Sequence, residues 1–191
     1  MTGFSGLPTT VWLTDVDTDR NMELTEDFWF DDAAGKRWDA PKTSVINGAS
    51  IPQALWSTVG SPYTGRYRRA SIVHDVACGR VINSADRRAA DRMFYEACRA
   101  GGCNIEQATL LYTGVRLGAL WDLVPFWKSA NKMDAPETKM TASISDRKIQ
   151  SDFAMAAEMV TAAPPTDDVM EMERRVDAAL SHVSGFDLTN R

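Results

Sequence analysis

The sequence predicts an α+β protein with a small N-terminal antiparallel β meander, a mainly helical core and a C-terminal helical hairpin. Short apolar and aromatic runs separated by turn residues occupy residues 11–45. After residue 68, apolar residues recur at alternating spacings of three and four, which is typical of amphipathic helices. Near the C-terminus, Pro164 and Pro165 separate two further stretches of this kind. Together these patterns predict strands first and helices afterwards.

The 191 residues suffice for one compact domain with an appendage, or for two small domains. We expect a β meander and three-helix core at 1–127, a polar linker at 128–142 and a helical docking segment at 143–191. The docking segment either binds a neighbouring protein or packs on its own domain. No apolar run approaches the roughly 18 residues that span a membrane, so no membrane span is expected.

The first strands are expected at residues 11–13, 22–25 and 28–30, with a turn at 31–36. Between the first two lies a run of oxygen-bearing side chains, Asp15, Asp17, Asp19 and Asn21. This run is similar to a calcium loop but lacks the central glycine and the distal glutamate of the EF-hand pattern. A solvated turn is the prediction.

A second turn is expected at Asn47 and Gly48, two residues that adopt positive φ at low cost. Ser50 is then placed to cap a short helical turn. Such a turn exposes backbone N–H groups, which are the raw material of an oxyanion or anion pocket. Asn47, Gly48 and Ser50 are therefore the candidate oxyanion residues.

Two consecutive helices are expected at about 68–81 and from Ser84 to Gly101. His74 falls at the border of the apolar stripe of the first, and Asp91 at the border of the stripe of the second. A border position suits a side chain that is partly buried yet open to solvent. Across an antiparallel helix pair, Asp91 could hydrogen-bond His74.

This pair has two interpretations. A histidine held by a carboxylate can act as a general base towards water, and Asp75 would then be free to bind a hard cation such as calcium. Backbone carbonyls of the turn at Asn47 would be further ligands. Alternatively, His74 and Asp91 form a satisfied buried polar pair that joins the helices and binds no substrate.

An ordered set of short motifs resembles a phage- and prophage-encoded family known as domain-of-unknown-function family 1353. The residues that carry the resemblance are Asn47-Gly48-Ala49-Ser50-Ile51-Pro52, Gly65-x-Tyr67, Ala70-x-x-x-His74-Asp75, Arg87-x-x-Ala90-Asp91-x-x-Phe94 and Tyr112-x-x-Val115-Arg116. The resemblance covers roughly residues 11–121 and implies a bacteriophage or prophage origin. It implies no particular activity.

The His-Asp helix followed by an Asp-x-x-Phe helix is also similar to the catalytic helix pair of secreted phospholipases A2. This resemblance implies that His74 is the water-activating base, Asp75 a calcium ligand and Asp91 the residue that orients the histidine. Cys78 stands where both groups usually have tyrosine, and Asn47 where the phage family usually has aspartate.

Two functions follow as expectations. The first is a virion-associated structural component (tail, connector or capsid-associated) that is made in the bacterial host cytoplasm and contacts other virion proteins through its C-terminal helices. The alternative is a phage hydrolase, phospholipase-like or cell-envelope-degrading, with calcium as a candidate cofactor. Net charge of −5 argues against direct nucleic-acid binding. The three cysteines do not form a disulfide framework, so reduced thiols are expected.

Overall fold

The computed structural model describes residues 2–14, 21–48, 51–61, 63–122, 139–185 and 187–188. The chain forms two compact units. Unit 1 consists of residues 1–51 and 60–104, and unit 2 consists of residues 52–59 and 105–191. The acidic run from Asp15 to Asp19 and the residue Ser50 lie outside the described residues.

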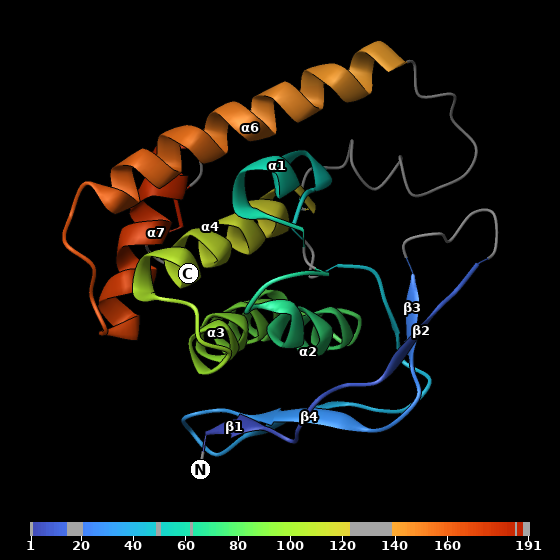
Figure 1. Cartoon of the computed structure of the whole chain (residues 1–191). Helices are drawn as coiled ribbons and strands as arrows, with labels where there is room; N and C mark the ends of the chain where they lie inside the picture. Colours follow the sequence, from blue (N-terminus) through green and yellow to red (C-terminus); the bar gives the residue numbers. More distant parts are fainter. Residues whose placement is uncertain are drawn as a thin grey trace. The chain divides into compact units, whose positions relative to one another are not determined.

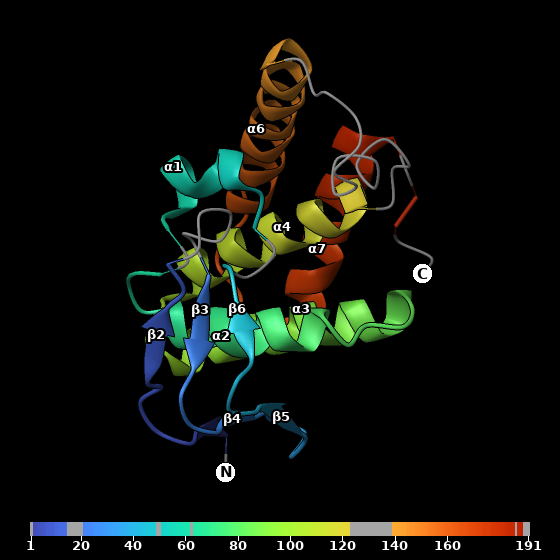
Figure 2. The ribbon, with the colours of Figure 1, turned by 90° about the vertical axis from the view of Figure 1, so that its right-hand side faces the viewer.

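Unit 1 contains two small antiparallel sheets. One sheet has the order β1-β4-β5, built from Gly3–Phe4, Phe28–Asp31 and Arg37–Ala40. The other has the order β2-β3-β6, built from Thr10–Trp12, Met22–Leu24 and Val45–Ile46. Figure 2 shows β2, β3 and β6 side by side. The predicted antiparallel strands are therefore divided between two sheets.

Alternation along the strands gives each sheet a buried face. In β4, Phe28 and Phe30 are buried while Trp29 between them is only half-buried. Phe4 of β1 lies against both phenylalanine rings, at centroid distances of 5.8 and 4.9 Å. Successive strand side chains point to opposite faces, so the aromatic residues of one face line the core of unit 1.

The helices of unit 1 are α2 (Arg68–Cys78) and α3 (Ser84–Ala100). Figure 1 shows them side by side, with β1 and β4 along one side of the pair. Asn83 caps α3, because its side chain accepts a hydrogen bond from the backbone N–H of Asp86. The cap is thus the residue immediately before the first helical residue, Ser84. The buried residues of α3 are Ala90, Asp91, Met93, Phe94, Tyr95, Ala97 and Cys98.

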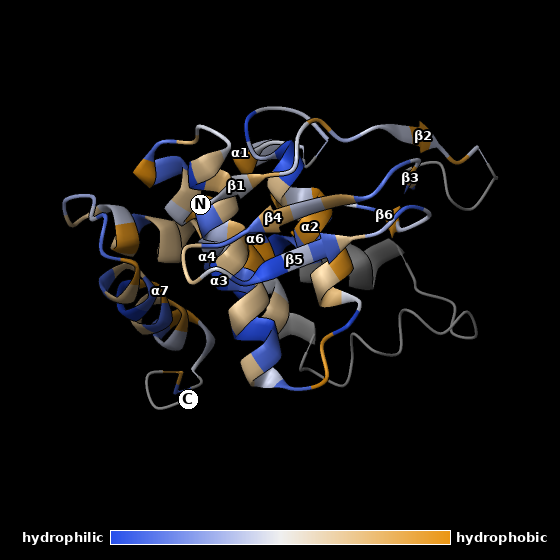
Figure 3. Cartoon of the chain, turned by 90° about the horizontal axis from the view of Figure 1, so that it is seen from below, coloured by the Kyte–Doolittle hydropathy of each residue, from blue (hydrophilic) through white to orange (hydrophobic). Residues whose placement is uncertain are grey.

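Unit 2 is helical. Its elements are η1 (Gln53–Leu55), α1 (Trp56–Val59), α4 (Ile105–Asp122), α6 (Lys139–Thr161) and α7 (Val169–Ser184). The two C-terminal helices pack on each other and on α4. Figure 3 shows hydrophilic and hydrophobic stretches alternating along α7, as expected for a helix that buries one face.

The predicted fold class is confirmed: small antiparallel sheets precede a mainly helical remainder that ends in a helical hairpin. The packing divides the chain differently from the predicted boundary near residue 127, because α4 belongs with the C-terminal helices. The predicted linker at 128–142 lies outside the described residues up to 138, and its last residues are the start of α6. None of the described helices is long and apolar enough to cross a membrane.

The first turn of α7 provides a test of the fold of unit 2. The carboxylate of Asp168 accepts hydrogen bonds from the backbone N–H groups of Met170 and Glu171, at 2.9 and 3.2 Å. We expect Asp168→Ala to lower the free energy of unfolding by about 1 kcal/mol, because two helix N–H groups lose their acceptor. Urea denaturation measures the change. The control is Glu158→Ala, which removes an exposed carboxylate from α6 and should change stability by less than about 0.5 kcal/mol.

Candidate functional site

The centre of unit 1 is a buried polar contact between α2 and α3. Nε2 of His74 lies 2.8 Å from Oδ1 of Asp91, and neither side chain is exposed to solvent. The predicted contact between the two side chains is therefore present. Their predicted border positions are wrong, because both side chains are fully buried. The reason is that the sheet and both helices contribute to one core around α2.

A third charged side chain completes this contact. Nε of Arg87 donates to the same carboxylate oxygen of Asp91 at 3.0 Å. Arg87 lies one turn before Asp91 on α3, a spacing that brings side chains together on one helix face. The Arg87 side chain is only 15% exposed, so the negative charge of Asp91 is balanced within the protein. We call His74, Arg87 and Asp91 the polar cluster.

Cys78 and Phe94 cover the imidazole ring. The sulfur of Cys78 lies 3.4 Å from Nε2 and 3.8 Å from Nδ1 of His74. Because the sulfur is nearly equidistant from both nitrogens, it does not lie along the N–H or lone-pair direction of either one. Asp91 is the hydrogen-bond partner of Nε2. The ring of Phe94 packs on the imidazole, with centroids 4.8 Å apart. The histidine is therefore enclosed by a thiol and an aromatic ring.

The surroundings determine the charge of His74. Burial by itself lowers the pKa of His74, because a charged imidazole loses its hydration. The interaction with the Cys78 sulfur and the hydrogen bond to Asp91 act in the opposite direction and outweigh burial. They raise the pKa of His74 to about 10. At neutral pH the imidazole is protonated, so it has no lone pair with which to accept a proton.

Asp75 points towards the turn at Asn47 and Gly48, as the sequence predicts. Its Oδ2 accepts hydrogen bonds from the backbone N–H groups of both residues, at 2.8 and 2.6 Å. Gly48 has a φ of 116°, a conformation that favours glycine. The carbonyl oxygen of Asn47 accepts a hydrogen bond of 2.6 Å from the hydroxyl of Tyr63.

This arrangement bears on the calcium and oxyanion roles. The groups of the turn that face Asp75 are N–H donors, whereas calcium requires oxygen ligands. The same N–H groups are the ones an oxyanion would need, and they already bind the carboxylate. Asp75 and the turn therefore fit neither role in this arrangement. Both roles stay predictions.

One group of side chains in the described residues could hold another metal. The ligand atoms of His74, Cys78 and Asp91 lie within 4.8 Å of one another. Nitrogen, sulfur and carboxylate oxygen are donors that suit zinc. However, Oδ1 of Asp91 already binds both His74 and the cationic Arg87, so a metal ion would have to displace both. The three ligand atoms are of types that suit zinc, but the hydrogen bonds from His74 and Arg87 to Asp91 compete with metal binding.

Arg87, Cys78 and Phe94 are the members of this site whose roles sequence reasoning missed. Helix spacing could have identified two of them. Cys78 follows His74 by four residues on α2, and Arg87 precedes Asp91 by four on α3. Phe94 could not be assigned from spacing with respect to His74, because the contact crosses from one helix to the other.

Unit 2 has a buried polar contact of its own between α4 and α7. The hydroxyl of Tyr112 donates to Glu173 at 3.3 Å, and Arg116 lies 3.6 Å from Asp177. Tyr112 and Arg116 belong to the last motif of the family resemblance, whereas Glu173 and Asp177 lie far beyond it. Buried charges require partners, so this contact explains why α4 packs with α7.

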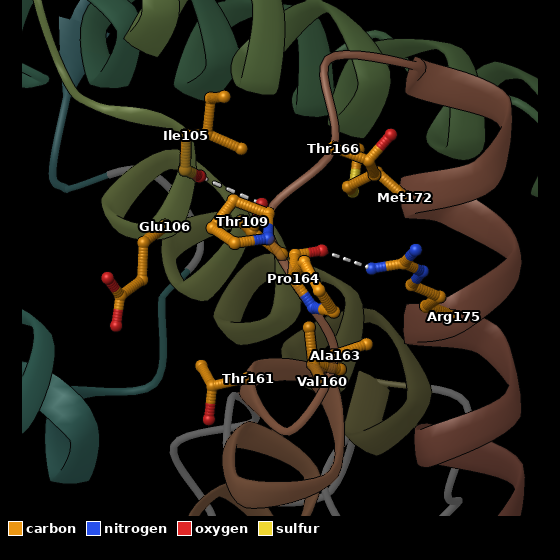
Figure 4. A pocket seen from close by; sticks show the side chains of 11 residues that line it. Ile105, Glu106, Thr109, Val160, Thr161, Ala163, Pro164, Thr166, Met172 and Arg175 are labelled. Carbon is orange, nitrogen blue, oxygen red and sulfur yellow. Dashed lines mark hydrogen bonds between the residues drawn. The ribbon is translucent and has the colours of Figure 1, made fainter.

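A cavity of about 130 Å³ also lies in unit 2, beside the connection between α6 and α7 (Figure 4). Its walls are mostly apolar, and they include Ile105, Val160, Pro164 and Met172. The guanidinium of Arg175 at its edge donates to the carbonyl of Pro164 at 2.7 Å (Figure 4) and to Glu171. No predicted site residue lines this cavity.

Comparisons with known proteins yield relatives without an assigned activity. The chain is 39% identical over 112 residues to the uncharacterized protein y4jT of Sinorhizobium fredii, covering 57% of this chain and 32% of y4jT. It is 36% identical over 121 residues to the uncharacterized protein y4iH of the same organism, covering 62% of this chain and 50% of y4iH. The chain thus spans half or less of the length of these relatives. No solved structure matches it significantly.

Residues 22–115 match the family DUF1353, described as a protein of unknown function. The matched region includes the whole of α2 and α3, and with them the polar cluster. It also includes Tyr112 but ends just before Arg116. The resemblance to this family of unknown function, which the sequence predicts, is confirmed over residues 22–115.

Proposed function

We propose that the chain is a structural, non-catalytic protein of a bacteriophage or prophage, associated with the phage particle. The observation that carries the non-catalytic part is the complete burial of His74 and Asp91. A general base must reach the water or substrate whose proton it takes. In the present arrangement neither side chain does so, and the polar cluster instead joins α2 to α3.

The charges of the cluster support the same proposal. His74 is protonated at neutral pH, and Asp91 is bound by two cationic groups. A catalytic histidine works best with a pKa near the operating pH, so that it exchanges protons readily. A histidine that stays charged at neutral pH between a carboxylate and an aromatic ring fits a structural ion pair better.

The C-terminal helices would bind the neighbouring virion protein. Met155 and Met159 lie one turn apart on α6 and are 45% and 41% exposed, and Met170 of α7 is 65% exposed. Flexible, polarizable methionine side chains are common at protein-binding surfaces.

Particle composition tests this proposal. Particles are purified from an induced lysogen that carries the gene, and the protein is measured by quantitative mass spectrometry. A fixed number of copies per particle is expected. The double variant Met155→Lys/Met159→Lys should be incorporated at least about tenfold less, because charged side chains would replace the apolar ones that contact the neighbouring virion protein. The matched control, Glu158→Lys, alters an exposed neighbouring position and should be incorporated normally. Absence of the wild-type protein from particles would contradict the proposal.

A phage hydrolase is the second candidate, and one observation favours it. Asp91 binds Nε2 rather than Nδ1, and the sulfur of Cys78 lies 3.8 Å from Nδ1. If α2 and α3 separated and the imidazole lost its proton, Nδ1 could accept a proton from water. The test is hydrolysis of phospholipid and peptidoglycan by the purified protein, with and without calcium, against His74→Ala. Activity that His74→Ala abolishes would establish this candidate in place of a non-catalytic role.

A further inference from the structure

The C-terminal end of α3 has the geometry of a Schellman motif. The backbone N–H of Gly102 donates to the carbonyl of Arg99, and the backbone N–H of Cys103 donates to the carbonyl of Cys98, both at 3.0 Å. Gly102 has a φ of 98°, the left-handed conformation that ends a helix in this way. In such a motif the side chains at the positions of Cys98 and Cys103 contact each other.

Two cysteines thus occupy the two positions that the helix end brings together. Both side chains are buried, at 0% and 2% exposure, and each thiol shifts the pKa of the other. A disulfide requires Cα atoms about 4.4–6.8 Å apart. Since the backbones of Cys98 and Cys103 are already joined by a 3.0 Å hydrogen bond, they need little movement to meet this requirement.

The surroundings make the two thiols unequal. The hydrogen bond from Cys98, together with the charges of Arg66 and Arg99, lowers the pKa of Cys103 in spite of burial. Burial, the hydrogen bond and the charge of Cys103 raise the pKa of Cys98 well above its usual value. Arg66 and Arg99 are held at this helix end, because they donate to the carbonyls of Gly102 and Cys103, each at 2.8 Å.

We propose that Cys98 and Cys103 are a reversible dithiol–disulfide pair that is oxidised by a small disulfide such as oxidised glutathione. The Cys103 thiolate attacks one sulfur of the oxidant, forms a mixed disulfide and releases one glutathione thiolate. The thiol of Cys98 then loses its proton and attacks the Cys103 sulfur, which releases the second glutathione. The protein loses two electrons and two protons, and one oxidised glutathione becomes two reduced ones.

Access comes from the position of the pair at a helix end. The last turn of a helix opens locally far more often than its middle, so the oxidant reaches Cys103 without global unfolding. Cys78 provides the contrast. It is half-buried at the last position of α2, and its sulfur contacts His74 rather than another thiol. Reaction at Cys78 would stop at the mixed disulfide.

Peptide mapping tests the pair directly. Trypsin cleaves after Arg92, Arg99 and Arg116, so Cys98 and Cys103 fall on separate peptides, 93–99 and 100–116. The folded protein is incubated with oxidised glutathione, its remaining thiols are alkylated, and the digest is analysed without reduction. We expect the two peptides to be joined, with the loss of two hydrogen atoms. Dithiothreitol added before alkylation should restore both thiols.

The background variant Cys78→Ser removes the third thiol, and Cys103→Ser in that background removes the attacking one. The joined peptides should form in Cys78→Ser and be absent in Cys78→Ser/Cys103→Ser. In the double variant, Cys98 should react with oxidised glutathione at least about tenfold more slowly than Cys103 reacts in Cys78→Ser. Two outcomes would overturn the proposal. One is glutathione attached to Cys98 or Cys103 without a link between them. The other is that both thiols stay unreacted while Cys78 of the wild type forms its mixed disulfide. Neither outcome bears on particle association.

Discussion

Replacing Asp91 with alanine should lower the free energy of unfolding by about 3–5 kcal/mol. Asp91 is fully buried and binds both the imidazole of His74 and the guanidinium of Arg87. Without the carboxylate, a buried histidine loses its hydrogen-bond partner and a mostly buried arginine loses its counter-charge. Most of this loss of stability comes from the two buried groups left without a partner, rather than from the contacts of the removed carboxylate atoms.

Urea denaturation of the variant and the wild type measures this loss. The control is Asp39→Ala, which removes an exposed carboxylate from β5 and should change stability by less than about 0.5 kcal/mol. A second variant, His74→Leu/Asp91→Leu, replaces both buried partners with apolar side chains and should be more stable than Asp91→Ala. Equal losses in Asp91→Ala and Asp39→Ala would show that the polar cluster does not join the helices.

Stability should also fall as the pH rises from about 6.5 to about 10. The pKa of His74 is near 6.5 in the unfolded chain and is raised to about 10 in the folded protein. A raised pKa means that the folded protein binds the proton more tightly. The resulting stability is fully present below pH 6.5 and is lost as the pH passes through 10. Each unit of difference in pKa contributes roughly 1.4 kcal/mol, so the whole effect is several kcal/mol.

The measurement is the free energy of unfolding by urea at intervals between pH 6 and about pH 10.5, where the imidazolium has been lost. Cys78→Ser should flatten the profile, because it removes the sulfur whose interaction with His74 contributes to the raised pKa of the imidazole. The difference between the two profiles isolates the contact between His74 and residue 78 from the other groups that titrate in this range. Identical profiles for the wild type and Cys78→Ser would contradict the assignment.

The sequence predicted those parts of the structure that depend on local pattern. The strand and helix order, the turn at Gly48 and the end of α3 after Ala100 all follow from residues that determine backbone conformation within a few positions. The meeting of His74 with Asp91 was also predicted, because two amphipathic helices joined by five residues must face each other along their apolar stripes.

Other features depend on packing between segments that are far apart in the sequence, and a local sequence pattern does not predict such packing. The burial of His74 requires both the sheet and α3 to cover α2, so a helical wheel places it at a border instead. The grouping of α4 with the C-terminal helices comes from contacts between segments far apart in the sequence, such as that of Arg116 with Asp177, 61 residues later. The direction of the N–H groups at Asn47 depends on Asp75, which binds them from another element.

Two consecutive residues of α2 bind in different directions. His74 binds α3 through Asp91, and Asp75 binds the end of β6 through the backbone of Asn47 and Gly48. Sliding α2 along its axis by one residue, about 1.5 Å, would break both sets of hydrogen bonds at once. The two side chains therefore fix the longitudinal position of α2 between the sheet and its neighbouring helix. The His-Asp dipeptide has a mechanical role in this fold, whatever chemistry is attached to it.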